Sequence, residues 1–253
     1  MASGKAQFGV SFQDSMAPGV AGDNALPNTA VAALIQHNTS GIISRKGEGM
    51  ERPKGLEGKK YATWDAPIEK AMMQNVVEKD GGDFSKVELI PSTVTDEVSA
   101  LKSKSVDAIW IFYAWAGVAT EVADLETDYF AFKDINPVFD YYTPVVIANN
   151  DFLEEKPDTA KAFLQALKQG YEDAIADPDE AASILLEASP ELDEELVKAS
   201  QEYLKDQYKA DVKQWGYIDP ARWNAFYGWL NENGLSEAEL PENAGFSNDY
   251  LPE

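Results

Sequence analysis

The sequence predicts an α/β fold in which central strands run parallel and reach the same ligand-facing edge. Predicted strands and helices alternate between residues 60 and 132, which is typical of a parallel sheet. The run Ala108–Trp115 is apolar throughout, as expected of a strand covered on both faces. Two predicted strands end in a tryptophan, Trp64 and Trp115, and a helix start follows each.

The amino-terminal third begins with strands. Gln7–Phe12 reads as a short buried strand, and an apolar run begins at Val31–Ile35. This run continues into Ile42 and Ile43, with Gly41 as a candidate hinge. Residues 44–58 are charged and glycine-rich, so we expect a surface connection there.

The next strand and helix are well marked. Lys60–Trp64 is a predicted strand, and the following helix covers Pro67 to Lys79 because apolar residues recur there at helical spacing. Pro67 suits the first helical turn, and Asp65 is a fair cap. Gly81 and Gly82 end the helix.

The alternation then continues. We expect a strand at Val87–Ile90, a helix at Asp96–Ser103, the central strand Ala108–Trp115, a short helix, and a strand at Tyr129–Phe132. Thr95 would cap the first of these helices. This order implies a parallel sheet with helices on both faces.

The last part of the chain is mainly helical. Tyr141–Ala148 is one more predicted strand. A helix follows over Pro157–Ala176, and Pro178, Pro190 and Pro220 mark three further helix starts. The helix over 157–176 should bury one apolar stripe, made of Phe163, Leu164, Leu167, Tyr171 and Ile175.

Composition excludes several classes of function. The chain has 253 residues, 44 acidic and 21 basic, and a net charge of -23. Such a charge repels nucleic acids and anionic lipid, so neither is an expected partner. There is no cysteine, which excludes disulfides and thiolate metal sites. No nucleotide-binding or catalytic motif is present, so we expect no catalytic residue, metal or cofactor.

Aromatic residues form the main candidate site. Trp64, Tyr113, Trp115 and Tyr142 lie at or near predicted strand ends, where ligands bind in open α/β sheets. Flat rings at this edge suit a flat, uncharged ring as ligand. The alternative is that they are ordinary core or rim aromatics, and this alternative is favoured for Trp110 and Phe112, within the strand. Trp215, Trp223 and Trp229 fall in the helical tail and are expected to be core or surface residues.

Polar residues near the same edge complete the candidate set. Gln13 and Asn38 offer hydrogen-bond donors and acceptors, and Asp65 could accept from a ring amine instead of capping its helix. His37 is the only histidine. We interpret it as a hydrogen-bonded residue between domains in preference to a catalytic base.

Five segments resemble the solute-binding proteins of ABC importers. The first, Ser3–Gln13, is similar to a stretch shared by many such proteins. The other four resemble the branch that binds thiamin pyrimidine precursors such as formylaminopyrimidine or hydroxymethylpyrimidine: Gln36–Ile42, Leu56–Trp64, Phe112–Trp115 and Phe139–Pro144.

The resemblance implies a type II periplasmic-binding-protein-like fold. Lobe 1 would combine residues 1–43 and 139–253, lobe 2 would cover 44–138, and the ligand would lie in the cleft between them. Hinge closure on the ligand would present the protein to a membrane permease. The resemblance also implies an extracytoplasmic, monomeric protein without a cofactor.

Two departures from the family pattern stand out. Compared with the family pattern, we expect the first strand–helix portion of lobe 1 to be absent, which would expose an apolar sheet edge there. Relatives also often carry an acid where this chain has Ala116.

Two alternatives remain. A pyrimidine synthase of the same fold would require a cysteine-rich segment and a histidine near Gln13, and neither is present. A sulfonate- or nitrate-binding protein would favour arginine in its site. The three arginines are Arg45 and Arg52, in the expected surface connection, and Arg222, on a carboxyl-terminal helix.

Overall fold

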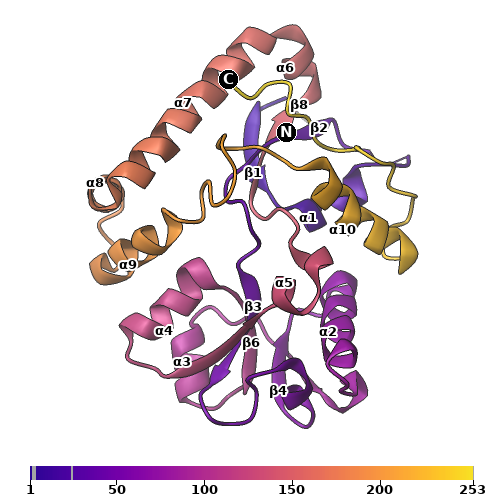
Figure 1. Ribbon diagram of the computed structural model, residues 1–253, viewed down its shortest axis with the longest axis vertical. Helices are drawn as coiled ribbons and strands as arrows, with labels where there is room; N and C mark the ends of the chain where they lie inside the picture. Colours follow the sequence, from indigo (N-terminus) through magenta and orange to yellow (C-terminus); the bar gives the residue numbers. More distant parts are fainter. Residues whose placement is uncertain (2–3, 24, 253) are drawn as a thin grey trace. The chain divides into compact units, whose positions relative to one another are not determined.

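The computed structural model describes residues 1, 4–23 and 25–252 (Figure 1). The chain divides into two compact units. Unit 1 combines Met1–Asn38, Asp140–Ser189 and Gln201–Glu253, and unit 2 combines Thr39–Phe139 with Pro190–Ser200. The units therefore separate at residue 38, whereas the expected boundary at residue 43 falls inside a strand.

Unit 1 is built on a three-stranded antiparallel sheet. Its order is β1 (Phe8–Ser11), β8 (Val145–Asn149) and β2 (Asn28–Ala33). Strand β8 starts four residues later than the expected strand at Tyr141. The reason is that Gln13 occupies the main-chain hydrogen-bonding groups of Tyr142 that a strand would use. Gln13 N donates to Tyr142 O over 3.0 Å, and Tyr142 N donates to Gln13 Oε1 over 2.9 Å.

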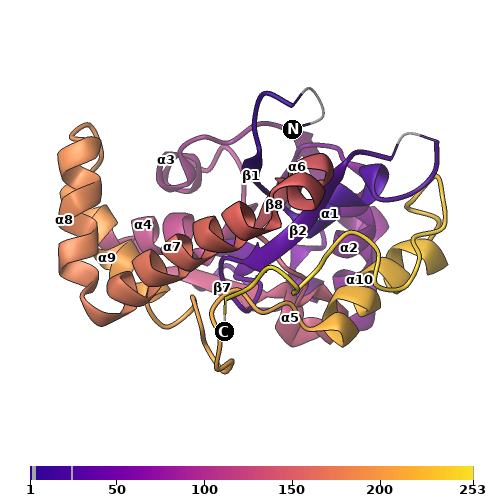
Figure 2. The same ribbon diagram turned by 90° about the horizontal axis from the view of Figure 1, so that it is seen from above.

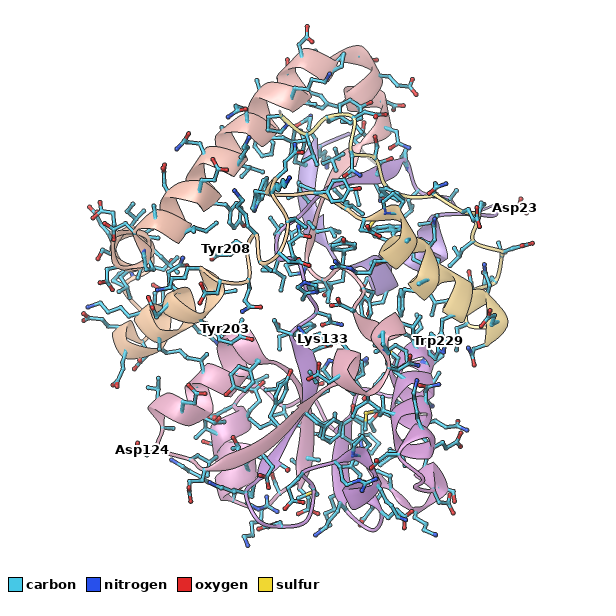
Figure 3. All side chains as sticks on the ribbon, in the orientation of Figure 1. Asp23, Asp124, Lys133, Tyr203, Tyr208 and Trp229 are labelled. Atoms are coloured by element: carbon cyan, nitrogen blue, oxygen red, sulfur yellow. The ribbon has the colours of Figure 1, made fainter. Side chains whose placement is uncertain are left out.

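Helix α7 (Pro157–Ala176) covers this sheet, preceded by α6 (Asn150–Glu155) (Figure 2). Leu164 of α7 is fully buried in a core cluster that also contains Val146 of β8 and Trp215. Tyr208, labelled in Figure 3, packs on the same core. Phe163 was expected in the core but is 40% exposed, because it stacks on Phe8 of the edge strand β1 at a ring distance of 4.0 Å.

The remaining helices of this part begin at capping aspartates. They are α8 (Pro178–Ala188) and α10 (Pro220–Glu232) of unit 1, and α9 (Glu194–Leu204), which begins in unit 2 and ends in unit 1. A short α1 (Gln13–Met16) follows β1. Asp177 and Asp219 cap α8 and α10 as their sequence signatures indicate. The start expected at Pro190 is wrong: Asp193 accepts from Leu196 N over 2.8 Å, so α9 begins at Glu194.

Unit 2 contains a five-stranded mixed sheet. Its order is β5 (Glu88–Pro91), β4 (Lys60–Thr63), β6 (Ala108–Phe112), β3 (Ser40–Arg45) and β7 (Thr127–Ala131). The first three strands run parallel, but β3 runs antiparallel to both of its neighbours. The four strands expected between residues 60 and 132 all run in the same direction, and the sheet is mixed because residues 40–45 insert as β3 between β6 and β7.

The helices of unit 2 are α2 (Pro67–Lys79), α3 (Glu97–Lys102), α4 (Val118–Val122) and α5 (Phe132–Ile135). Helix α2 has the predicted bounds but not the predicted cap. Asp65 has a left-handed backbone, with φ of 64°, and pairs with Lys70. Instead the buried Glu69 accepts from Ala66 N over 3.3 Å and from Tyr61 Oη over 2.6 Å.

Short 3₁₀ turns complete the elements, at Ala17–Gly19, Pro53–Leu56, Phe84–Lys86 and Pro137–Phe139. In the part of the chain that the structure describes, no helix combines the length and the apolar character needed to span a bilayer.

Arg45 is a buried ion-pair centre, although its segment was expected at the surface. Its guanidinium donates to Glu48 Oε2 over 2.8 Å, to Asp107 Oδ1 over 2.6 Å, and to Val106 O over 2.8 Å. The side chain is only 10% exposed. Because β3 carries Arg45, these bonds fasten the end of β3 to the loop that precedes β6.

We expect Arg45→Met to lower the free energy of unfolding by about 3 kcal/mol, because it leaves two carboxylates without their partner in a partly buried site. Urea unfolding would measure the change. Arg52→Met is the control, since Arg52 is 64% exposed and its pair with Asp80 should contribute much less. Equal losses in the two variants would contradict the structural role of Arg45.

Candidate ligand-binding site

Two tryptophans lie at one edge of the unit 2 sheet. Strands β4 and β6 pair in parallel, with Tyr61 opposite Ala108 and Ala62 opposite Ile109. The chain therefore leaves both strands at the same edge. Trp64 follows the last residue of β4, and Trp115 lies in a π-helical turn, Tyr113–Gly117, that follows β6.

These are the exposed tryptophans of the chain. The side chains of Trp64 and Trp115 are 52% and 44% exposed, whereas Trp215 and Trp223 are fully buried and Trp229 is 8% exposed. Exposure of a large apolar side chain is informative when several gather at one place. The arrangement suits stacking against a flat ring.

Trp110 adds to this aromatic edge. Its ring packs edge-on against Trp64 at a centroid distance of 5.1 Å and tilted against Phe132 at 4.2 Å. Trp110 is partly exposed, whereas Ile109 and Ile111 on either side of it are buried. The sequence indicated an ordinary core or rim aromatic here, because every residue of β6 is apolar and the two faces of the strand cannot be told apart.

Tyr113 is held in place by its neighbours. The sequence predicted a strand that continues to Trp115. Strand β6 instead ends at Phe112, so Tyr113 and Trp115 belong to the turn that follows it. The Tyr113 hydroxyl donates to the Glu121 carboxylate, and its ring packs on Tyr129 at 4.7 Å. Gly117 is required beneath it, because a Cβ there would lie 2.5 Å from the Tyr113 ring.

A recess of about 140 Å³ opens beside Trp64. We call it the Trp64 recess. It is lined by Ala62, Trp64, Ser92, Thr93, Val94, Glu97, Ile109 and Trp110. One side is therefore aromatic and aliphatic, and the other carries two hydroxyls and one carboxylate.

The candidate residues of unit 1 are buried. Gln13 Nε2 donates to Trp223 O over 2.9 Å, and its Oε1 accepts from Tyr142 N, so the Gln13 amide binds main chain on both sides. Tyr142 is 1% exposed and its hydroxyl accepts from Asp219 N over 2.8 Å. The structure brings Gln13 and Tyr142 together, with Arg222 placed 4.9 Å above the Tyr142 ring.

Asn38 is also buried, and its main chain binds Asp140, which belongs to a cluster of charged residues around His37. Asn38 N donates to Asp140 Oδ1 over 2.8 Å, and its side chain hydrogen-bonds Tyr141. The other oxygen of the same carboxylate, Asp140 Oδ2, lies 2.6 Å from His37 Nδ1.

His37 lies between two carboxylates. Its Nε2 lies 3.0 Å from Asp211 Oδ1, so each ring nitrogen faces an acceptor. A neutral imidazole has only one N–H, which leaves the other nitrogen without a proton to donate. The hydrogen bond to Asp140 accordingly raises the pKa of His37, against the opposing effects of burial and of the positive charge of Arg222.

Asp14 is the other notable acid of unit 1. Burial raises the pKa of its carboxyl, and its Oδ1 is buried without a hydrogen-bond partner among the described residues. The pKa of Tyr227 is also raised, first by burial and second by the charge of Asp14. The sequence analysis did not single out Asp14, because acids are common in this chain.

Comparison with known proteins places these features in a family. Residues 1–181 match the family model described as NMT1/THI5 like. The chain belongs to this family. A formylaminopyrimidine-binding protein of Halalkalibacterium halodurans is 27% identical over 259 residues, which cover 97% of this chain and 75% of the relative. A second relative is the 4-amino-5-hydroxymethyl-2-methylpyrimidine phosphate synthase THI5 of Saccharomyces cerevisiae, 22% identical over 89% of this chain and 67% of its own length.

Among solved structures, the periplasmic aliphatic sulphonate binding protein SsuA of Escherichia coli matches with a TM-score of 0.66 and 16% identity, over 94% of this chain and 74% of that protein. The NMT1/THI5-like chain therefore has the expected α/β fold of the type II periplasmic-binding kind, with two lobes and mixed sheets.

The single histidine makes the first prediction from this site simple to check. Only one imidazole resonance exists, and NMR titration should give His37 a pKa above the ordinary value of about 6.5. Asp140→Asn should lower that pKa more than Asp211→Asn does, because Asp140 contributes the larger effect.

The raised pKa of His37 also has a consequence for stability. Its contribution is fully present below the unfolded pKa and is lost as the pH rises through the folded pKa. His37→Asn should flatten this decline. A His37 pKa at or below the ordinary value would contradict the bridged geometry.

The pKa of Asp14 is also raised, so the sign is the same as for His37. The folded state holds the proton more tightly than the unfolded state, so stability falls as the pH rises from about 4 through the folded pKa. Asp14→Asn should therefore raise the melting temperature at pH 7, whereas Asp23→Asn, at an exposed residue labelled in Figure 3, should leave it unchanged. A lower melting temperature for Asp14→Asn alone would show that the ionised carboxylate is needed.

Proposed function

We propose that this chain is the substrate-binding component of an ABC importer and binds a thiamin pyrimidine precursor, such as formylaminopyrimidine or hydroxymethylpyrimidine. The observation that carries the proposal is the pair of exposed tryptophans at one edge of the unit 2 sheet, Trp64 and Trp115. The relative from Halalkalibacterium halodurans, named as a formylaminopyrimidine-binding protein, supports the choice of ligand.

The physical basis is the match between an aromatic edge and a flat ligand. A stacked aromatic pair contributes about 0.5–1.5 kcal/mol beyond the area that it buries. Trp64 and Trp115 expose about half of their side chains, so a pyrimidine ring would remove a large apolar area from water. Asp65 and the hydroxyl of Tyr113 come from the same two chain segments, and we assign them to orienting the ligand. Gln13, Asn38 and Tyr142 remain proposed ligand-binding residues of unit 1.

The synthase function of the yeast relatives is the second candidate, and two observations favour binding over it. The chain has no cysteine. Its one histidine, His37, has a carboxylate at each ring nitrogen and is therefore committed to an ion-pair cluster.

A sulfonate ligand, suggested by the fold neighbour SsuA, is disfavoured by the state of the arginines. Arg45 and Arg52 each pair with carboxylates in unit 2. Arg222 donates to Gln36 O and lies over the Tyr142 ring. An anion would have to compete with these partners for every guanidinium of the chain.

The proposed setting follows from the proposed role. The protein would act as a monomer outside the cytoplasmic membrane and deliver its ligand to a permease. It would need no cofactor, because binding and release involve no covalent step.

Isothermal titration calorimetry would test the proposal. The protein should bind hydroxymethylpyrimidine or formylaminopyrimidine and not taurine. Trp64→Ala and Trp115→Ala should each weaken binding at least tenfold, which corresponds to about 1.4 kcal/mol. Tyr217→Ala is the matched control, because Tyr217 is a 36% exposed aromatic residue of unit 1.

Two results would contradict the proposal. One is the absence of heat with both pyrimidines. The other is pyrimidine binding that Trp64→Ala and Trp115→Ala leave as tight as Tyr217→Ala does.

A further inference from the structure

We propose that Glu97 selects for an amino-substituted pyrimidine: its carboxylate accepts hydrogen bonds from the exocyclic amine while the ring occupies the Trp64 recess. This inference rests on the proposed function and deepens it. It assigns a ligand subsite and the residue that gives the subsite its specificity.

The recess has the size of a single ring. Its volume is about 140 Å³, and an engineered protein cavity of about 150 Å³ is known to hold benzene. The apolar wall comes from two parallel strands, with Ala62 and Trp64 on one chain segment and Ile109 and Trp110 on the other. The edge-on packing of Trp64 against Trp110 keeps this wall in shape.

The polar wall comes from the segment between β5 and α3. Ser92 N donates to Thr63 O over 3.0 Å, which fastens the start of this segment to the end of β4, directly before Trp64. Ser92, Thr93 and Glu97 then line the recess. Glu97 is the one ionisable side chain among the lining residues, so it sets the charge that a ligand meets there.

The fold does not need Glu97 to begin its helix. Asp96 is the cap of α3, and its Oδ1 accepts from Ser99 N over 2.8 Å. The hydrogen bonds from Ser99 lower the pKa of Asp96 and keep that carboxylate charged. Glu97 is half-buried beside it and lines the recess. Its remaining structural role is that of an acid in a first helical turn, which is a weak and replaceable one.

The chemistry of a carboxylate explains the selectivity. An ionised carboxylate only accepts hydrogen bonds. The amine of an aminopyrimidine donates, so the two groups match. A pyrimidine with an oxo group at that position presents a second acceptor, which would leave both groups unpaired. Sites that hydrogen-bond a ligand N–H reject analogues lacking it by large factors, up to 10⁴–10⁵.

Calorimetric titration of three proteins with two ligands tests this role. The ligands are hydroxymethylpyrimidine, which carries the 4-amino group, and its 4-oxo analogue. The proteins are the unmodified chain, Glu97→Gln and Glu88→Gln. Glu88 is an exposed acid at the opposite end of β5 and serves as the matched control.

We expect the unmodified chain and Glu88→Gln to prefer the amino ligand at least thirtyfold. Glu97→Gln should bind the amino ligand at least tenfold more weakly and should prefer it less than threefold, because a Gln amide both donates and accepts. Circular dichroism melts that coincide for the three proteins would assign the loss to the ligand contact.

Two outcomes would overturn the inference, and they differ in what else they overturn. If Glu97→Gln keeps both the affinity and the preference of the unmodified chain, Glu97 is only a first-turn acid and the proposed function stands. If the unmodified chain binds neither pyrimidine, the proposed function fails together with the inference.

Discussion

The parallel pairing of β4 with β6 is the constraint on which the candidate site depends. Because Tyr61 lies opposite Ala108 and the strands run in the same direction, the chain leaves both strands at the same edge of the sheet. An antiparallel arrangement would send Trp64 and Trp115 to opposite edges. Glu69 links the end of β4 to the start of α2 at this edge, since its carboxylate accepts hydrogen bonds from Thr63 Oγ1 and from Ala66 N. The left-handed backbone of Asp65 then turns the chain directly after Trp64.

Charge is used differently in the two units. The chain has 44 acids for 21 bases, so few carboxylates can find a basic partner. In unit 2, Arg45 gathers Glu48 and Asp107 around the end of β3. In unit 1, His37 and Arg222 share Asp140, whose other oxygen binds Asn38 N. Arg45, His37 and Arg222 are thus committed to structural ion pairs, and at the aromatic edge Lys70 pairs with Asp65.

Local signals in the sequence predicted much of the fold. Prolines marked the starts of α2 and α7, and aspartate–proline signatures marked the starts of α8 and α10, because the first helical turn is a local structure. The errors arose where contacts with residues far away in the sequence determine the local structure. The strand expected from Tyr141 begins at Val145, since the Gln13 side chain accepts the hydrogen bond from Tyr142 N. Residues 40–45 were assigned to the wrong part of the fold because strand pairing is a long-range property.

The same distinction applies to the candidate site. The position of Trp64 and Trp115 after strands was readable from the sequence, and their exposure agrees with a surface role. The burial of Gln13, Asn38 and Tyr142 was not readable, because it depends on α10 and on residues more than 70 positions away, such as Asp219. The partial exposure of Trp110 was not readable either, because every residue of β6 is apolar. Glu97 was missed because nothing local distinguishes it from the other acids.

The central claim is that a pyrimidine ring binds at the exposed tryptophans, and the six indole N–H resonances provide the most direct test. Titration with hydroxymethylpyrimidine, followed by two-dimensional NMR of the assigned indoles, should shift the resonances of Trp64 and Trp110, which line the recess, and of Trp115, which lies at the same sheet edge. The resonances of the buried Trp215 and Trp223 should move least. Saturable shifts confined to Trp215, Trp223 and Trp229 would place the ligand elsewhere and contradict the account.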